Sequence, residues 1–351
     1  MLKKLHLFIL LPALSLMLSS CVKDDAERGM DGMEWTADET TPTPVEFFVG
    51  EAPSLSVKAA PVGDISYLSE HNFGIVGFSG EFKENNVLIR SRARVGSDGQ
   101  AYFVDASGER VELTYPFNSP YNYTFYAYYI GDDVAYDSIE LQGMQYGVAI
   151  PDYGKVDVLC GSAAATPVYL GQERVDGFNA KYIRALKTLG LYNREYLPNI
   201  EMKHLCTMIN FHFCYEDEVN ADEQVYISRV AACGINYSGF LYFNTGSIST
   251  YAKGKIQYLT KQWVGKDKLT IPEVNFYLNP SDLEDLYFEI AVNYTNTVSP
   301  LTAVISAEQI KQVLADNGVD GFSPAFCYSF DVTLKKQGYS YVTELSAHRT
   351  N

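Results

Sequence analysis

The chain has 351 residues, with 43 acidic and 27 basic side chains and a formal net charge of −16. A charge of this sign argues against binding to nucleic acid or to an anionic lipid surface, because both would repel the protein. Hydrophobic residues make up 47% of the chain, which excludes a chain that is disordered as a whole. The 27 tyrosines and 19 phenylalanines favour β-strands, where one side of an aromatic ring packs and the other meets water.

Residues 1–21 have the features of a bacterial lipoprotein signal peptide. Lys3 and Lys4 supply the positive end, residues 5–18 form an apolar run, and two serines lead to Cys21, whose thiol would accept the lipid. The alternative is an ordinary cleaved secretory signal with a coincidental cysteine. On the lipoprotein interpretation, the protein is expected outside the cytoplasm, held to a membrane by its lipid.

The rest of the chain is expected to contain a tether and two domains. Residues 22–44 are acidic and end in alternating Thr and Pro, which favours a flexible tether. The remaining length suffices for two domains, and we assign residues 45–165 to an N-terminal β-sandwich and residues 201–351 to a C-terminal one. Residues 166–200 change in composition and lack strand patterns, so we expect a linker or insertion with a short helix.

Several segments have the composition or the two-residue period of a β-strand. They are residues 45–49, 73–78, 121–130, 204–215, 225–231, 286–294 and 326–334. In the last two, apolar and polar side chains alternate, as in a strand that buries one face. We expect residues 204–215 to form one straight strand.

Two segments have helical patterns. The first runs from a candidate N-cap at Asn179 to a stop signal at Gly190. The second covers residues 306–318 and opens with a capping box formed by Ser306 and Gln309. Many strands with two short helices in the connections predict an all-β protein built as a pair of sandwiches.

The cysteines indicate neither a zinc site nor a redox site. Six cysteines become five once Cys21 is acylated, and their spacings match no metal-binding or redox pattern. Cys206 and Cys214 are the one pair considered for a disulfide. On one straight strand they would lie about 26 Å apart and could not bridge each other. We interpret the cysteines as mostly buried small side chains.

No catalytic or metal-binding arrangement is recognisable, so neither an enzyme activity nor a cofactor is expected. The sequence contains no nucleophile elbow, phosphate-binding loop, zinc-protease motif or dinucleotide fingerprint. The histidines of the mature chain, which show no metal-ligand spacing and are interpreted as structural polar residues, are His71, His204, His212 and His348. Acidic clusters such as residues 282–285 are interpreted as solvated turns. A surface hydrolase therefore ranks last among the hypotheses.

A series of short motifs resembles one known family. The motifs are the lipobox ending at Cys21; residues 73–78; Tyr115-Pro116 leading into residues 125–129; residues 157–159 followed by 161–163; His204 with residues 209–211; and residues 328–334 followed by the turn 335–338. In this order they resemble the fimbrillin family, the lipoproteins of Bacteroidetes type V pili. The resemblance implies two tandem transthyretin-like β-sandwiches and a role in building or decorating a surface fibre.

The residues after the lipobox support the same resemblance. Lys23, Asp24 and Asp25 look like the export signal that carries Bacteroidetes lipoproteins to the outer face of the outer membrane. The implied location is the cell surface, with the lipid in the outer membrane and with incorporation into pili as a further expectation. The implied partners are other pilus subunits and a host protein or glycan receptor.

The resemblance also implies assembly by strand addition. In the family, a trypsin-like protease cuts after an arginine near the N-terminus and removes the first strand, and the vacated groove receives the C-terminal strand of another subunit. The candidate cleavage residues here are Arg28, Lys58, Arg90, Arg92 and Arg94. A cut at Arg28 would leave residues 45–49 in place, and the arginine cluster fits a solvated strand face equally well. This departure favours an anchor, tip or accessory subunit over a stalk subunit.

The C-terminal segment is the candidate for a terminal or donor strand. Its apolar side chains are Tyr339, Tyr341, Val342 and Leu345. We expect it to be the last strand of the second sandwich, with donation to another subunit as the alternative.

The competing hypothesis is a glycan-binding surface lipoprotein of a polysaccharide-uptake system. It would explain the aromatic richness by stacking of rings on sugars. It predicts exposed aromatic side chains in a flat patch, for which Trp35 and Trp263 are the candidates.

Overall fold

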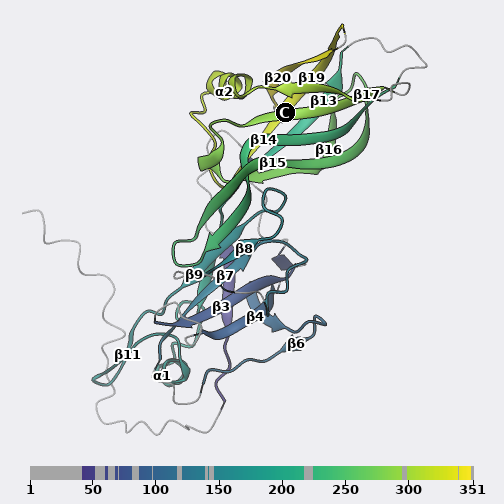
Figure 1. Ribbon diagram of the computed structural model, residues 1–351. Coiled ribbons are helices and arrows are strands. Elements are labelled where there is room, and N and C mark those ends of the chain that lie inside the picture. Colours follow the sequence, from purple (N-terminus) through teal and green to yellow (C-terminus); the bar gives the residue numbers. More distant parts are fainter. Residues whose placement is uncertain are drawn as a thin grey trace, which may run out of the picture.

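The computed structural model describes residues 42–51, 60–61, 68–69, 71–80, 87–96, 98–116, 121–138, 141, 146–216, 224–294, 299–338 and 340–348. These residues form a mainly β-structure with two α-helices, drawn out along one axis (Figure 1). The predicted predominance of β-strands is confirmed. No helix in this described part is long and apolar enough to cross a membrane.

The first part of the fold is a ring of seven described strands that closes on itself. The order of pairing is β1-β12-β9-β7-β3-β4-β5, and β5 pairs again with β1. The strands are β1 (Phe47–Glu51), β3 (Phe73–Ser79), β4 (Val87–Val95), β5 (Gln100–Val104), β7 (Tyr123–Tyr129), β9 (Leu159–Ala163) and β12 (Asn199–His204). We call this ring the barrel. The short strand β6 (Arg110–Val111) pairs with the free part of β5.

Strand β3 is buried on both faces, which explains its continuous apolar sequence. Phe73 and Ile75 point into the barrel core, whereas Val76 and Phe78 belong to the core of the second part of the fold. Gly74 allows close packing on the outer face, because a Cβ atom there would lie 2.3 Å from the Tyr128 ring. The barrel wall is thus shared between two cores.

The barrel core is closed at one end by helix α1 (Ala180–Leu189) and by the hairpin of β10 (Val168–Leu170) and β11 (Glu173–Val175). The predicted N-cap is confirmed, because the Asn179 side chain accepts a hydrogen bond from the Tyr182 backbone nitrogen. The predicted stop is also confirmed, since Gly190 has the left-handed φ of 70° that ends the helix. Residues 166–200, expected to form a linker or insertion, therefore pack their apolar side chains into the barrel core.

The second part of the fold contains two sheets. One has the order β16-β13-β19-β2, with β20 also paired to β19, and the other has the order β15-β14-β17-β18, with β8 also paired to β14. Their strands are β2 (Ala60–Pro61), β8 (Gly147–Ile150), β13 (Thr207–Tyr215), β14 (Val225–Tyr242), β15 (Ser247–Val264), β16 (Leu269–Leu278), β17 (Tyr287–Tyr294), β18 (Leu301–Ile305), β19 (Phe326–Gln337) and β20 (Ser340–Ala347).

The two sheets pack face to face, and aromatic side chains fill the space between them. Phe211 of β13 packs against Phe288 of β17 with ring centroids 4.7 Å apart. Helix α2 (Ala307–Asp316) follows β18 and opens with the predicted capping box of Ser306 and Gln309, which is confirmed. The short 3-10 helix η3 (Pro280–Asp282) follows β16.

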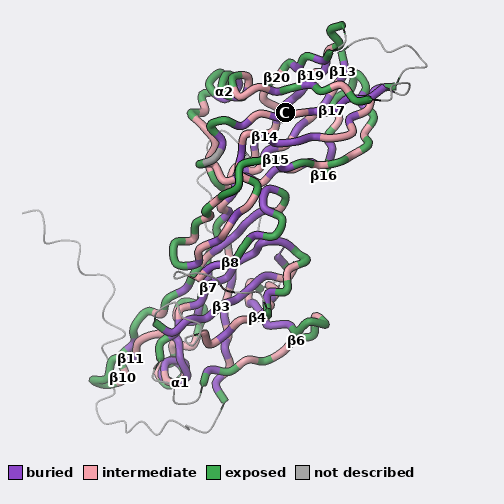
Figure 2. The backbone as a smooth tube through the Cα atoms, in the orientation of Figure 1, coloured by how far each residue is buried: buried purple, intermediate pink, exposed green. Residues whose placement is uncertain are grey.

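The hairpin of β14 and β15 connects the two parts of the fold. Each strand has 18 residues, and the dark green hairpin in Figure 1 reaches down to the barrel. At its tip Phe243 packs on Tyr128 of the barrel with ring centroids 4.7 Å apart. Residues 147–150, which the sequence analysis placed in the first sandwich, pair with β14 in the second part. Figure 2 shows buried segments running without interruption through this junction.

The expectation of one straight strand over residues 204–215 is wrong. His204 ends β12 in the barrel, and β13 begins at Thr207 in the other part of the fold. The Leu205 backbone nitrogen donates to the Val158 carbonyl at 2.8 Å, and a buried His204–Asp157 hydrogen bond of 2.5 Å holds the same turn. The described cysteines, including Cys206 and Cys214, are free thiols.

Candidate functional site: the chain-end strands

Strand β1 forms part of the barrel wall and fills its interior. Val45, Phe47 and Val49 alternate inward and are 6%, 1% and 3% exposed. Phe47 packs against Phe103 of β5 with ring centroids 5.1 Å apart. Because the two-residue period directs every second side chain inward, removal of β1 would expose an apolar groove.

The two edges of β1 differ in their pairing. On one edge β1 runs parallel to β12, with four residue pairs from Phe48–Asn199 to Glu51–Met202. On the other edge it meets β5 in two antiparallel pairs only, Phe47–Ala101 and Phe48–Gln100. We call this short β1–β5 contact the seam. Together with the β12–β9 contact, which also has two residue pairs, it has the least backbone pairing in the ring.

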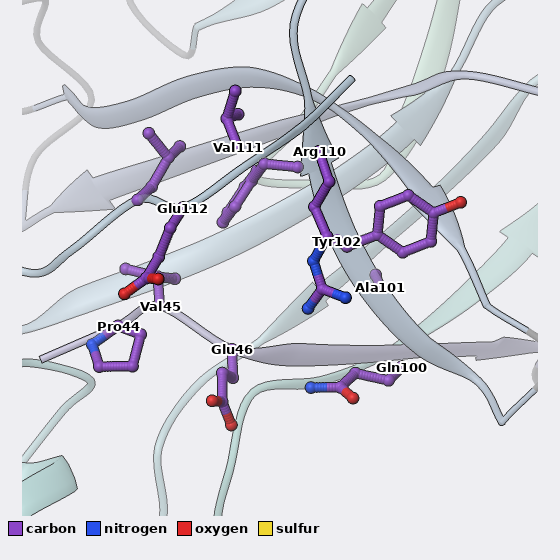
Figure 3. A pocket seen from close by; sticks show the side chains of 11 residues that line it. Pro44, Val45, Glu46, Gln100, Ala101, Tyr102, Arg110, Val111 and Glu112 are labelled. Atoms are coloured by element: carbon purple, nitrogen blue, oxygen red, sulfur yellow. The ribbon is translucent and has the colours of Figure 1, made fainter. Parts of the chain in front are cut away.

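A cavity of 370 Å³ opens beside the seam (Figure 3). Residues 44–46 line one side of it, and residues 100–103 and 110–113 line the other. Figure 3 shows the Arg110 side chain reaching from β6 toward the space beside Glu46. The Arg110 guanidinium carbon lies 5.5 Å from the centroid of the Tyr102 ring. The cavity is polar, and its side chains include no Ser, Cys or His that could act as a nucleophile or base.

Residues that follow α1 hold the segment leading into β1. The Tyr192 hydroxyl donates a hydrogen bond of 2.6 Å to the Glu46 carboxylate. Burial, followed by the hydrogen bond and charge of Glu46, raises the pKa of Tyr192. The Val45 backbone nitrogen also donates to the Leu113 carbonyl at 2.8 Å. The chain before β1 is therefore fixed on both sides.

Strand β20, at the other end of the chain, is less buried than β1 and lies at the edge of its sheet. It pairs with one strand, β19, over eight antiparallel pairs from Phe330–Ala347 to Gln337–Ser340. Tyr341 is 5% exposed, but Val342 is 38% exposed, and Leu345 is only half-buried. Thr343 fastens the strand, since its hydroxyl donates to the Val304 carbonyl at 2.7 Å and its own carbonyl accepts from the Gln309 amide at 2.8 Å.

Several predicted site residues lie outside the described part of the chain. They are Cys21, Lys23, Asp24, Asp25, Arg28, Lys58 and Tyr339, together with Trp35. The lipidation, the export signal and the first two cleavage candidates therefore stay predictions.

The three remaining cleavage candidates lie on β4, inside the barrel wall. β4 pairs with β3 on one edge and β5 on the other. The Arg92 side chain bonds Asp137 at 3.0 Å, and the Arg94 side chain bonds Asn72 at 2.9 Å. A protease binds an extended, unpaired backbone, so cleavage at Arg90, Arg92 or Arg94 would require the barrel to open first.

Two clusters were not recognised from the sequence. The rings of His212 and His348 stack against each other, a contact that the spacing of the histidines along the sequence does not indicate. Trp263 of β15 is 41% exposed and lies opposite Tyr226 of β14, with ring centroids 5.0 Å apart. Trp263 is thus part of an aromatic pair. The pair could not be predicted, because the sequence does not indicate that β15 pairs with β14. In the described part of the chain, no three His, Cys, Asp or Glu side chains gather in a way that could hold a metal ion.

Comparisons with known proteins give one kind of match. No family model matches the sequence, and no curated protein matches it either. Solved structures do match. A candidate cell adhesion protein from Bacteroides fragilis has a TM-score of 0.48 and 9% identity, covering 89% of this chain and 99% of its own.

Two further solved structures have a similar arrangement. A fimbrial assembly protein from Parabacteroides distasonis has a TM-score of 0.41 and 11% identity, covering 88% of this chain and 99% of its own. A candidate polysaccharide-binding protein from Bacteroides thetaiotaomicron has a TM-score of 0.43 and 10% identity, covering 88% of this chain and 98% of its own. These neighbours are Bacteroidetes proteins with adhesion, fimbrial or polysaccharide-binding descriptions, the group to which the sequence resemblance points.

Proposed function

We propose that the protein is a structural or adhesive component of a cell-surface pilus, held at an end of the fibre as an anchor, tip or accessory subunit. One observation carries the proposal: the strand at the start of the described chain is embedded in a core, whereas the strand at its end lies on the edge of a sheet. Val45, just before β1, and Phe47 and Val49 of β1 are all buried, whereas on β20 Tyr341 and Thr343 are buried and Leu345 is buried only in part.

The contrast matters because strand addition has a direction. A subunit that accepts a strand must have an empty groove, and a subunit that donates one must release a strand of its own. Repeated head to tail, this contact grows a filament. A subunit whose groove stays filled by its own β1 can donate but cannot accept, so it belongs at an end of the fibre.

The proposal extends to the whole chain. The barrel and the two-sheet part would correspond to the two transthyretin-like sandwiches that the resemblance implies. Cys21 would carry the lipid in the outer membrane, and the protein would act by contact with other subunits or a receptor, without catalysis or a cofactor. Nothing in this arrangement requires cleavage at Arg28 or beyond.

Two engineered disulfides test which strand moves. Phe48→Cys with Gln100→Cys would fasten β1 across the seam, because these residues are antiparallel partners. Lys335→Cys with Val342→Cys would fasten β20 to β19. We expect the oxidised β1-locked protein to co-purify with fibre subunits and the oxidised β20-locked protein to be excluded until it is reduced.

A third pair is the matched control. Tyr169→Cys with Arg174→Cys joins β10 to β11, away from both chain-end strands, and should not affect assembly in either redox state. Exclusion of the β1-locked protein would contradict the end position. Absence of the unmodified protein from purified fibres, with electron micrographs unchanged by its deletion, would contradict the pilus role altogether.

A second candidate function is glycan binding, and the pairing of the exposed Trp263 with Tyr226 favours it. A screen of the purified protein against polysaccharides tests it independently of assembly. Saturable binding to one polysaccharide, without co-purification of fibre subunits, would favour this candidate over the first.

A further inference from the structure

The outward face of β14 and β15 combines exposed aromatic rings with positive charge. The side chains that form it are Trp263, Lys261 and Leu259 of β15 and Tyr226 and Arg229 of β14; we call this face the β15 platform. Trp263 is opposite Tyr226 in the register, and Leu259 is opposite Arg229. Ile256 and Val264 of the same strand are buried in the second core, so the alternation along β15 separates the platform from the core side.

The platform presents apolar surface to water. Leu259 is 75% exposed and Trp263 is 41% exposed. Figure 2 shows β15 as a largely exposed strand. The Trp263 and Tyr226 rings meet edge to face at an angle of 65°, which leaves indole surface uncovered. Leu259 and Trp263 lie on the same face of β15, with Lys261 between them, and exposed apolar side chains on one face form the kind of surface that a ligand covers.

The charge around these rings is positive in a strongly acidic protein. β15 contains three lysines and neither Asp nor Glu, although the chain has a net charge of −16. The Lys261 ammonium nitrogen lies 5.7 Å from the centroid of the Tyr226 ring and 6.0 Å from that of the Trp263 ring. Lys261 makes no ion pair with a described carboxylate, so its charge is open to a ligand.

Two carboxylates lie nearby and both are already engaged, and one of them, Glu273, accepts a hydrogen bond from the Thr260 hydroxyl at 2.9 Å. Glu289 of β17 contacts Arg229 at 3.6 Å and Lys255 at 3.7 Å. The glutamate balances one of these two cations, and Lys261 adds another charge beside the rings. At physiological salt, charges beyond about 8 Å are largely screened, so these local cations outweigh the distant acidic surface for a ligand in contact.

We propose that the β15 platform binds an anionic polysaccharide, with a sugar ring stacked on Trp263 and a sugar carboxylate or sulfate paired with Lys261. The apolar face of a sugar ring matches a flat indole, and the acidic group matches the cation beside it. The nine residues from Lys255 to Trp263 extend about 26 Å along the strand, which is long enough to contact several successive sugars. This inference rests on the second candidate function above and names its ligand class and its site.

Binding of full-length protein to polygalacturonate, chondroitin sulfate and neutral dextran, measured by isothermal titration calorimetry, tests the proposal. We expect saturable binding to at least one of the two acidic polymers, weakened by added salt, and none to dextran. Trp263→Ala and, separately, Lys261→Glu should each weaken binding by roughly tenfold or more. Trp263→Phe, which keeps an aromatic ring, should retain most of the affinity.

The matched control is Tyr169→Ala, which removes an aromatic ring that is 48% exposed on the β10–β11 hairpin. It should bind as the unmodified protein does, and circular dichroism should show every variant folded. Binding that survives both Trp263→Ala and Lys261→Glu would overturn the proposed site.

Three other outcomes distinguish failure of this inference from failure of the glycan-binding function on which it rests. Equal binding to dextran would overturn the anionic ligand class while glycan binding stands. No binding to any of the three polymers, when a wider glycan screen does find a ligand, would overturn this inference alone. Salt-sensitive self-association of the purified protein that Lys261→Glu abolishes would show that the occupant is a second copy of the chain, and would overturn the proposal.

Discussion

His212 on β13 and His348, directly after β20, stack their imidazole rings with centroids 3.7 Å apart and planes 25° apart. Asp331 of β19 lies beside the stack and bonds His348 Nδ1 at 2.7 Å and the Lys268 ammonium group at 2.5 Å. Thr270 bonds His212 Nδ1 at 2.6 Å. His348, the last described residue of the chain, is thus tied to β13 through His212 and to β19 through Asp331.

This cluster predicts that acid weakens the fold. Burial, and then the neighbouring His348, lowers the pKa of His212 from its ordinary 6.5, and the Asp331 charge only partly opposes this. Between pH 6.5 and the lowered pKa, the unfolded chain binds more protons than the folded chain at this residue. Stability from His212 should therefore fall as the pH falls through that window. The urea midpoint measured at neutral pH and at a pH below the window should show the loss.

His212→Gln is the comparison for this experiment, because it removes the titrating group and keeps a polar side chain. The drop in midpoint between the two pH values should be smaller in the variant than in the unmodified protein. Equal drops in both proteins would mean that His212 does not contribute.

Tyr136→Phe should destabilise the barrel. The buried Tyr136 hydroxyl accepts a hydrogen bond from the Ile130 nitrogen at 3.0 Å and donates one to the Gly131 carbonyl at 2.7 Å. The variant leaves both backbone groups buried without this partner, at a cost of about 1–3 kcal/mol in the free energy of unfolding. Urea denaturation measures the change. Tyr169→Phe, at an exposed ring, is the control and should be neutral; a neutral Tyr136→Phe would refute the role of these bonds.

Much of the local structure could be predicted, because its signals lie within short segments. Asn179, Gly190 and the Ser306–Gln309 capping box define both helices through bonds to neighbouring residues. The alternation in residues 326–334 likewise reports one buried face, which β19 presents to the core.

Features that depend on pairing between distant segments could not be predicted, because no short segment of the sequence indicates them. Residues 247–255 of β15 are exposed or half-buried on both faces, so they show no apolar period, and pairing with β14 alone makes them a strand. The seam depends on β1 meeting β12 and β5, which come from distant parts of the chain. The break at Cys206 was missed, although the buried positions change phase there, from residues 200, 202 and 204 in β12 to residues 207, 209 and 211 in β13.

Gly147→Ala should loosen the attachment of β8 to β14. A Cβ atom at residue 147 would lie 2.1 Å from the Leu241 carbonyl oxygen, which is backbone and cannot rotate away. Forcing the two strands apart should cost about 1–3 kcal/mol and increase cleavage by protease near the barrel junction. Gly265→Ala is the matched control, because a Cβ atom there meets no atom within 4 Å. Unchanged protease resistance in Gly147→Ala would contradict the close approach.

Asp157→Ala should be among the most damaging changes in the described chain. Asp157 and His204 are hydrogen-bonded at 2.5 Å, with side chains only 8% and 3% exposed. Burial raises the pKa of Asp157, and the hydrogen bond and charge of His204 only partly offset this effect. Removing one member of such a pair leaves the other buried without its partner, and typical costs reach about 3–5 kcal/mol.

The position of this pair determines which strands would lose stability first. Asp157 precedes β9 and His204 ends β12, at the turn where the chain leaves the barrel for β13. We therefore expect Asp157→Ala to lower the urea midpoint and to raise hydrogen exchange first in β9 and β12. Asp137→Ala, which removes the exposed carboxylate of the Arg92 ion pair, should cost no more than about 1 kcal/mol. If both variants lose the same small amount of stability, the buried pair does not hold the junction.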